Sequence, residues 1–352
     1  MDGIMARLRE DDTLRRRLII LAVLLVLLLL AALLLSRKVN QKGQIADSSF
    51  SFLISIYDLT NPLGVATDRD ENIYVSNTGS SEVIVYDKEG VRQRKIEDTK
   101  DEKGAPLRFY SPYGIAVDDD NDKLYVADYN WQGVRVLTRE GEFLYNLPKT
   151  PQDIPLDPTM GFTPFGVAVG NDHVYVVSKD GIYVFDTEGN YQTHWGSRGS
   201  EIGQYDFPNG IAVDRASGNL FVADSLNRRV VSLDRDGKIR WVLGVTSGED
   251  QSVFQLPRSV AVGPDGLVCI TDTFWHKIFV VDQNGKLVSE FGERGTEDGQ
   301  FSFPEGLAVS SSDRLYVADR QNNRVQIWQM ATPLPEPPQA DPQKFLNSLK
   351  TQ

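Results

Sequence analysis

The segment FPNGIAVDRASGNLFVADSLNRRVVSLDRDG runs from Phe207 to Gly237, and it is the best of six copies of one phrase. The other five begin PLGVATD, PYGIAVD, PFGVAVG, PRSVAVG and PEGLAVS, at Pro62, Pro112, Pro164, Pro257 and Pro304. Successive prolines are 50, 52, 44, 49 and 47 residues apart. A period of this length, built from short β-type segments, predicts the blades of a β-propeller.

Each copy predicts four strands. In the best copy the first strand is IAV after Pro-x-Gly, the second is FVAD and the third is RVVSLD, while the fourth follows a glycine turn. Branched and aromatic residues fit a pleated surface, and Gly, Asp and Asn mark turns. Such a sheet cannot bury both faces alone, whereas blades in a ring cover one another. We therefore predict an all-β, six-bladed propeller whose blades start near residues 62, 112, 164, 208, 257 and 304.

The ring needs a strand to close it. The sixth copy ends in RVQIWQM and continues as ATPLPEPPQADP, so it offers no fourth strand. The stretch FSFLISIYDL (Phe50–Leu59) precedes the first copy and is predicted to be a single strand. We expect it to complete the last blade from the N-terminal side, which gives a propeller over residues 49–330.

The repeats resemble those of the NHL-repeat family. The strongest matches are WGSRGSEIGQYDFPNGIAVD (Trp195–Asp214), FGERGTEDGQFSFPEGLAVS (Phe291–Ser310), VADSLNRRV and VADRQNNRV. Two copies depart from the pattern, since the fifth has Ser259 in place of glycine and the third ends in VVSKDG. The resemblance implies a six-bladed propeller and, because NHL domains commonly bind other proteins, a surface for a protein or peptide partner.

A long apolar run stands before the repeats. Leu18 to Leu35 contains eighteen consecutive apolar residues, eleven of them leucine. At about 1.5 Å per residue a helix of that length spans roughly 27 Å, enough for a hydrocarbon core. Five arginines precede the run and three basic residues follow it, which favours an N-terminus inside the cell. A cleaved signal peptide is the alternative, although LLLSRKVNQ lacks a small-residue cleavage motif.

These features predict five segments, listed in order: a cytoplasmic tail (1–17), a single-pass signal anchor (18–35), a linker (36–48), the propeller (49–330) and a proline-rich tail (331–352). The propeller is expected outside the cytoplasmic membrane. Residues 1–42 hold eight basic and four acidic residues, so the remainder carries 29 basic and 45 acidic residues, a net charge of −16. An acidic surface repels phosphate, and nucleic acid is not expected as a partner. The single Cys269, in LVCITD, is predicted to be a core residue.

The repeated charges follow the fold. Acidic residues end the second strands and arginines begin the third strands, at Asp128, Asp224, Asp272 and Asp319 and at Arg135, Arg229 and Arg324. A ring of functional charge is one interpretation. Because they recur in phase with the blades, we predict instead that they brace the loops by local hydrogen bonds.

The residues bearing on catalysis are few. His173, His194 and His276 fall in different kinds of segment, so they are not expected to share a metal ion. Asn209 and Glu305, the middle residues of two Pro-x-Gly entrances, are the alternative, as ligands of a calcium ion at the channel mouth. Blade five places the cation Arg258 at the equivalent position. We predict no catalytic residues and no cofactor.

The non-repeating residues point to a binding surface. In this topology the Pro-x-Gly entrances and the second-to-third-strand loops open on one face of the ring. Aromatic residues and arginine dominate interface energetics, and loops rarely need exposed aromatics for folding. The predicted partner-binding residues are Tyr113, Tyr129, Trp131, Phe165, Arg258, Phe274, Trp275 and Arg320. We predict a membrane-anchored scaffold that binds a protein or peptide; a lactonase- or lyase-like enzyme with a central metal and a ligand-sensing ectodomain are the alternatives.

Overall fold

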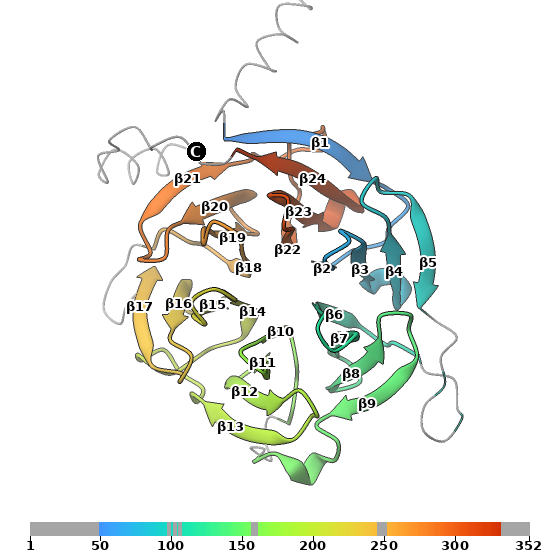
Figure 1. Ribbon diagram of the computed structural model, residues 1–352. Helices are drawn as coiled ribbons and strands as arrows, with labels where there is room; N and C mark the ends of the chain where they lie inside the picture. Colours follow the sequence, from blue (N-terminus) through green and yellow to red (C-terminus); the bar gives the residue numbers. More distant parts are fainter. Residues whose placement is uncertain are drawn as a thin grey trace, which may run out of the picture. The chain divides into compact units, whose positions relative to one another are not determined.

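The computed structural model describes residues 49–96, 100, 104, 108–155, 161–244 and 252–331. Within them the strands form six antiparallel sheets of four strands each. Figure 1 shows these sheets placed radially, with β2, β6, β10, β14, β18 and β22 innermost. The predicted all-β, six-bladed propeller is confirmed.

The first three blades follow the chain without interruption. Their strands are β2 (Gly64–Thr67), β3 (Ile73–Asn77), β4 (Glu82–Tyr86) and β5 (Arg92–Ile96) in blade 1; β6 (Pro112–Asp118), β7 (Lys123–Asp128), β8 (Gly133–Thr138) and β9 (Phe143–Leu147) in blade 2; β10 (Gly166–Gly170), β11 (His173–Ser178), β12 (Gly181–Asp186) and β13 (Tyr191–Trp195) in blade 3. Each innermost strand starts within two residues of its predicted position.

Blades 4 and 5 repeat this order, and blade 6 combines the two ends of the ring. Their strands are β14 (Pro208–Val213), β15 (Leu220–Asp224), β16 (Arg229–Leu233) and β17 (Ile239–Gly244) in blade 4; β18 (Pro257–Val262), β19 (Val268–Asp272), β20 (Lys277–Val281) and β21 (Leu287–Phe291) in blade 5; β22 (Pro304–Val309), β23 (Arg314–Asp319), β24 (Arg324–Met330) and β1 (Phe50–Ile56) in blade 6.

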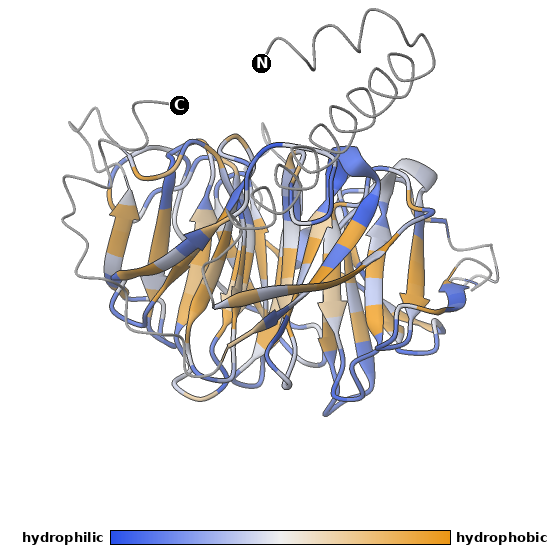
Figure 2. Cartoon of the chain, turned by 90° about the horizontal axis from the view of Figure 1, so that it is seen from above, coloured by the Kyte–Doolittle hydropathy of each residue, from blue (hydrophilic) through white to orange (hydrophobic). Residues whose placement is uncertain are grey.

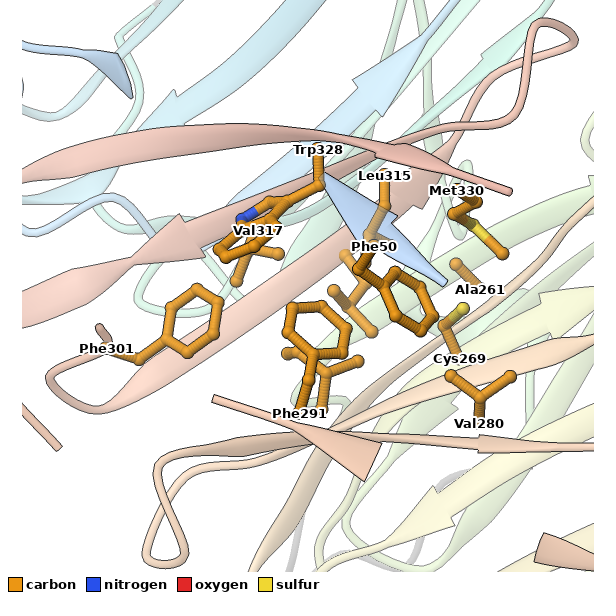
Figure 3. Close-up of a cluster of buried hydrophobic side chains, with 12 residues drawn as sticks. Phe50, Ala261, Cys269, Val280, Phe291, Phe301, Leu315, Val317, Trp328 and Met330 are labelled. Atoms are coloured by element: carbon orange, nitrogen blue, oxygen red, sulfur yellow. The ribbon is translucent and has the colours of Figure 1, made fainter. Parts of the chain in front are cut away.

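The strand β1 closes the ring. It pairs antiparallel with β24, from Phe50 opposite Met330 to Ile56 opposite Val325. The stretch Phe50–Leu59 therefore supplies the outer strand that the sixth repeat lacks, as Figure 1 also shows. The ring of Phe50 stacks on Phe291 of blade 5, with centroids 4.2 Å apart. Figure 3 shows this contact beside Trp328, in the core between blades 5 and 6.

We refer to two faces of the ring. The upper face carries the Pro-x-Gly entrances, the second-to-third-strand loops and the connections between blades. The lower face carries the remaining turns. Figure 2, a side view, shows hydrophobic strands between more hydrophilic loops at both faces. The chain enters and leaves the propeller at the lower face, where the Ala331 N–H donates to Ser49 O at 2.8 Å.

The Pro-x-Gly entrances are explained by close approach of neighbouring innermost strands. A Cβ added at Gly114 would lie 2.5 Å from the carbonyl oxygen of Phe165, closer than real Cβ atoms come. The Gly114 N–H donates to that same oxygen at 2.8 Å, across the blade boundary. A Cβ at Gly306 would meet Leu63 O at 2.5 Å in the same way. Glycine is needed because backbone packs on backbone around the axis.

The two departures from the repeat are accommodated locally. In blade 5, the N–H of Ser259 donates to Thr271 Oγ1 at 2.9 Å, and its Oγ accepts from the Leu307 N–H at 3.2 Å. The hydroxyl thus makes a bond at a position where other blades have glycine. In blade 3, β11 and β12 pair up to Ser178 opposite Gly181, which leaves a two-residue turn in place of the usual loop. Neither blade loses a strand.

The repeated Asp and Arg residues brace the blade connections. Asp224 accepts from the Asp206 N–H at 2.8 Å and from Arg229 Nε at 2.8 Å. The rest of that guanidinium donates to three carbonyl oxygens of the preceding connection, those of Ser200, Glu201 and Gln204. Blade 6 repeats the arrangement with Asp319 and Arg324. These contacts confirm the predicted bracing role of the repeated residues.

Two further sequence interpretations bear on the core and on the membrane. Cys269 is fully buried in the cluster of Figure 3, and burial raises the pKa of its thiol, as expected for a core residue. The apolar run Leu18–Leu35 lies outside the described residues, and so does the predicted proline-rich tail after Ala331. In the part of the chain that is described, no helix has the length and apolarity needed to span a bilayer.

Candidate functional site

The upper end of the central channel is a small cavity lined by residues that differ from blade to blade. Its volume is about 80 Å³. The middle residue of every Pro-x-Gly entrance lines it, in the order Leu63, Tyr113, Phe165, Asn209, Arg258 and Glu305. We refer to this cavity and its rim as the upper mouth. Its composition divides it into an apolar half from blades 1 to 3 and a polar half from blades 4 to 6.

The apolar half is an aromatic cluster. Tyr113, Tyr129 and Phe165 lie in mutual contact, with ring centroids 5.4, 5.3 and 6.1 Å apart. Phe207 packs on the other side of Phe165, at 5.8 Å between centroids. Burial raises the pKa of Tyr113, and the nearby charge of Arg258 opposes that rise. Three residues predicted from separate loops thus form one surface, which Phe207 extends.

The polar half is a chain of charge-assisted hydrogen bonds. Arg258 Nε donates to Glu305 Oε2 at 2.8 Å, and Arg320 Nη1 donates to Glu305 Oε1 at 3.1 Å. Arg320 Nε also donates to Asn61 Oδ1 at 2.8 Å, which fixes its orientation. Asn209 donates to Phe207 O at 2.7 Å and to Ser225 Oγ at 2.9 Å. Glu305 is 5% exposed, so its carboxylate is largely withdrawn from solvent.

The remaining three predicted residues lie away from the channel. Trp131 packs over the guanidinium of Arg135, 3.8 Å from it, and Trp275 donates from Nε1 to Val253 O at 3.2 Å. Both tryptophans are half-buried and fill space beside the blade connections. Phe274 is different, since 51% of it is exposed, while its ring meets Phe303 edge-on.

Two family models each match one part of the chain. The NHL repeat matches residues 301–328, and a family described as a 6-bladed beta-propeller matches residues 165–240. The chain is a six-bladed β-propeller that contains an NHL repeat. Both matches fall on repeats that contribute to the polar half of the upper mouth, through Asn209 and Glu305.

The relatives of this NHL propeller have varied names. Peptidylglycine alpha-amidating monooxygenase of Rattus norvegicus is 36% identical over 137 residues, covering 36% of this chain and 14% of the relative. NHL repeat-containing protein 2 of Gallus gallus is 23% identical over 372 residues, covering 83% of this chain and 50% of the relative. The chain therefore spans a small fraction of the rat enzyme. A solved streptogramin B lyase aligns with a TM-score of 0.54 at 13% identity, covering 81% of this chain and 99% of that one, which shows the fold alone.

Sequence reasoning missed several exposed apolar residues on the upper face. They stand in the connections between blades or in the second-to-third-strand loops, and each is more than half exposed: Tyr57, Tyr110, Ile202 and Leu226. Together with Phe274 they place most of the exposed large apolar side chains of the described residues on one face of the NHL propeller. The signal was available, because an apolar side chain in a polar loop has no obvious core to enter. Phe207 was missed because it precedes the proline of its repeat.

The metal hypothesis finds little support at the predicted ligands. Both carboxylate oxygens of Glu305 are engaged by arginines, and two cations beside that carboxylate disfavour a third. Among the described residues, no group of three His, Cys, Asp or Glu side chains is placed to hold a metal ion. The histidines lie in three places: His173 contacts Asn171 O at the lower face, His194 is in β13, and His276 accepts the Phe303 N–H at the upper face.

A second cavity, of about 370 Å³, opens at the lower end of the channel. The turns that follow β2, β6, β14, β18 and β22 line it, with Asp68, Asp119 and Asp214 among its residues. Arg139 approaches two of these carboxylates, at 3.5 Å from Asp68 and 3.2 Å from Asp119. The acidic groups are thus partly neutralised by the propeller itself.

Proposed function

We propose that this NHL propeller is a binding module whose upper face docks a protein or peptide partner. The observation that carries the proposal is the upper mouth together with the exposed apolar residues around it. Aromatic and arginine side chains at the centre of a face are the typical composition of interface hot spots. The lower face has no comparable cluster of exposed large apolar side chains among the described residues.

The size of the upper mouth supports a binding role over an enclosed reaction. Sites that bury a small-molecule substrate measure about 300–1,000 Å³, whereas this cavity measures about 80 Å³. Side chains of a partner lying across the face can enter such a cavity without being enclosed by it. We also propose that Leu18–Leu35 anchors the chain in the cytoplasmic membrane. The described chain begins at Ser49 on the lower face of the propeller, opposite the upper loops.

Site-specific photo-crosslinking in cells tests the proposal. A photoreactive phenylalanine analogue replaces Phe274 or Tyr110 on the upper face, and Val91 on the lower face is the matched control because it is also exposed and apolar. We expect one partner protein to be crosslinked from both upper positions and not from Val91. Equal crosslinking from both faces, or none from the upper face, would contradict the proposal.

An enzyme is the second candidate, favoured by the name of the rat amidating enzyme among the matches. The 370 Å³ cavity at the lower end of the channel is large enough for a small substrate. Metal analysis of the purified full-length protein decides between the two candidates. Stoichiometric zinc or calcium that survives dialysis would favour the enzyme, and its loss without effect on crosslinking would favour the docking surface.

A further inference from the structure

The Arg258 guanidinium at the upper mouth has donors to spare. Its Nε is bound to Glu305, whereas neither Nη atom has a hydrogen-bond partner among the described residues. Its side chain is 20% exposed and lines the cavity. Arginine offers five N–H donors in a rigid fork. The end of the fork formed by Nη1 and Nη2 is therefore open, in the geometry that binds a carboxylate through two parallel hydrogen bonds.

The net charge at the upper mouth also favours an anion. Arg258 and Arg320 share the single carboxylate of Glu305, while the other hydrogen-bond partner of Arg320 is the neutral amide of Asn61. One positive charge thus remains uncompensated within this triad. Partial burial strengthens its attraction for an anion, because water screens it less than at an open surface. The domain around it is acidic, with a net charge of −16 beyond residue 42.

The size and lining of the cavity indicate which kind of group it can bind. Its volume of about 80 Å³ is well below the roughly 300–1,000 Å³ of a site that buries a whole small molecule. A cavity of this size suits the end of one side chain of a partner that lies across the face. The aromatic cluster of Tyr113, Tyr129 and Phe165 stands across the cavity from Arg258 and offers an apolar surface to whatever adjoins a carboxylate bound by Arg258.

We propose that the upper mouth receives the side-chain carboxylate of an Asp or Glu residue of the partner. Arg258 binds it through Nη1 and Nη2, and Glu305 with Arg320 holds the Arg258 fork in place. An apolar residue next to that acid packs on the aromatic cluster. This assignment rests on the proposed docking function and specifies what the partner must present: an acidic residue flanked by an apolar one.

An array of short synthetic peptides tests the assignment on the full-length protein in detergent. The peptides carry randomised positions and are capped at both ends, so that side chains supply every carboxylate. We expect bound peptides to be enriched in Asp or Glu beside an apolar residue. Replacing that acid by its amide in the best peptide should weaken binding at least tenfold, and so should Arg258→Gln. An array without acid preference overturns the assignment.

Control variants distinguish the effect of losing the Arg258 charge from an effect on folding. Arg294→Gln removes the same charge from an exposed residue in a blade connection on the same face, and it should leave peptide binding unchanged. Arg258→Lys keeps the charge but loses the fork, so it should bind with intermediate affinity. Thermal melting shows whether each variant is folded. A second array with free C-termini distinguishes the source of the carboxylate, and binding that requires the free terminus overturns the side-chain assignment.

The two proposals fail in different ways. If Arg258→Gln leaves peptide binding intact while the partner is still crosslinked from Phe274, the docking function stands and the carboxylate site is wrong. If the upper positions crosslink no partner, the docking function itself is wrong, whatever the peptides do.

Discussion

The lower and upper faces of the propeller are made from the same repeats but use their polar residues differently. At the lower face, the turn between third and fourth strands has one construction in blades 1 to 5. An Asp or Thr side chain accepts the N–H four residues later, as Asp87 does from Val91 at 2.8 Å and Asp234 from Lys238 at 2.9 Å. A glycine closes each turn, as Gly237 does by donating to Asp234 O at 3.0 Å. These polar groups make their hydrogen bonds within the turn that contains them.

At the upper face, the Asp–Arg braces also repeat, but the mouth between them does not. The six middle residues of the Pro-x-Gly entrances include a leucine, two aromatics, an amide, a cation and an acid. No feature of the turn requires this variety, since the same backbone is formed by all six. Repetition therefore marks what the fold needs, whereas the departures at one face mark where binding is to be sought.

The largest expected effect is at a repeated brace. Arg229→Met leaves the buried Asp224 and three carbonyl oxygens without their donor. Removing one partner of a buried ion pair costs about 3–5 kcal/mol, so the free energy of unfolding, measured in urea, should fall by that amount. Arg198→Met, at an exposed position on the same face, should change it by less than about 0.5 kcal/mol. Equal stability of both variants would refute the bracing role.

The next effect is on binding at the upper mouth. Tyr129→Ala removes one ring of the aromatic cluster, and an interface hot spot of this type is worth at least about 2 kcal/mol, or roughly thirtyfold in affinity. Affinity for the crosslinked partner should fall accordingly, while Val91→Ala on the lower face leaves it unchanged. A fall in unfolding free energy without loss of affinity would instead make Tyr129 a structural plug.

A smaller effect is expected at a lower turn. Asp234→Ala removes the acceptor for the Asp236 and Lys238 amides, and the loss of such hydrogen bonds costs about 1 kcal/mol of unfolding free energy. Asp236→Ala makes the same charge change in the same turn and should cost less. Partner affinity is expected to be unchanged in both variants. Weakened binding by Asp234→Ala would mean that the lower face takes part in recognition.

The smallest effect concerns pH at the upper face. Burial and the charge of Arg294 lower the pKa of His276, whose Nδ1 accepts the Phe303 N–H at 3.1 Å. The unfolded chain therefore binds a proton more readily than the folded one, and stability should decrease as the pH falls below about 6.5, the usual pKa of histidine. His276→Gln should flatten this decrease between pH 6.5 and 5 in melting experiments, and match wild type more closely at pH 8. An unchanged pH profile would contradict the assignment.

Much of the fold was predictable because its determinants are local or repeated. Alternating apolar residues and turn residues located the innermost strands to within two residues, and the missing fourth strand of the last repeat pointed to β1. The candidate site was predictable only in part. All eight residues predicted to bind a partner belong to upper-face segments, but Trp131 and Trp275 pack beside the blade connections. Their rotamers and neighbours depend on the adjoining blade, which no single repeat encodes.

The sequence by itself determined the number of blades, the closing strand and the face on which the unlike residues gather, because these follow from periodicity and from strand direction. Only the tertiary structure decided what the unlike residues do together. Glu305 was a candidate calcium ligand until Arg258, 47 positions earlier, and Arg320, 15 positions later, were found on its two oxygens. The charge state and free donors of a site depend on distances between side chains from different blades. Those distances are set by how the ring closes.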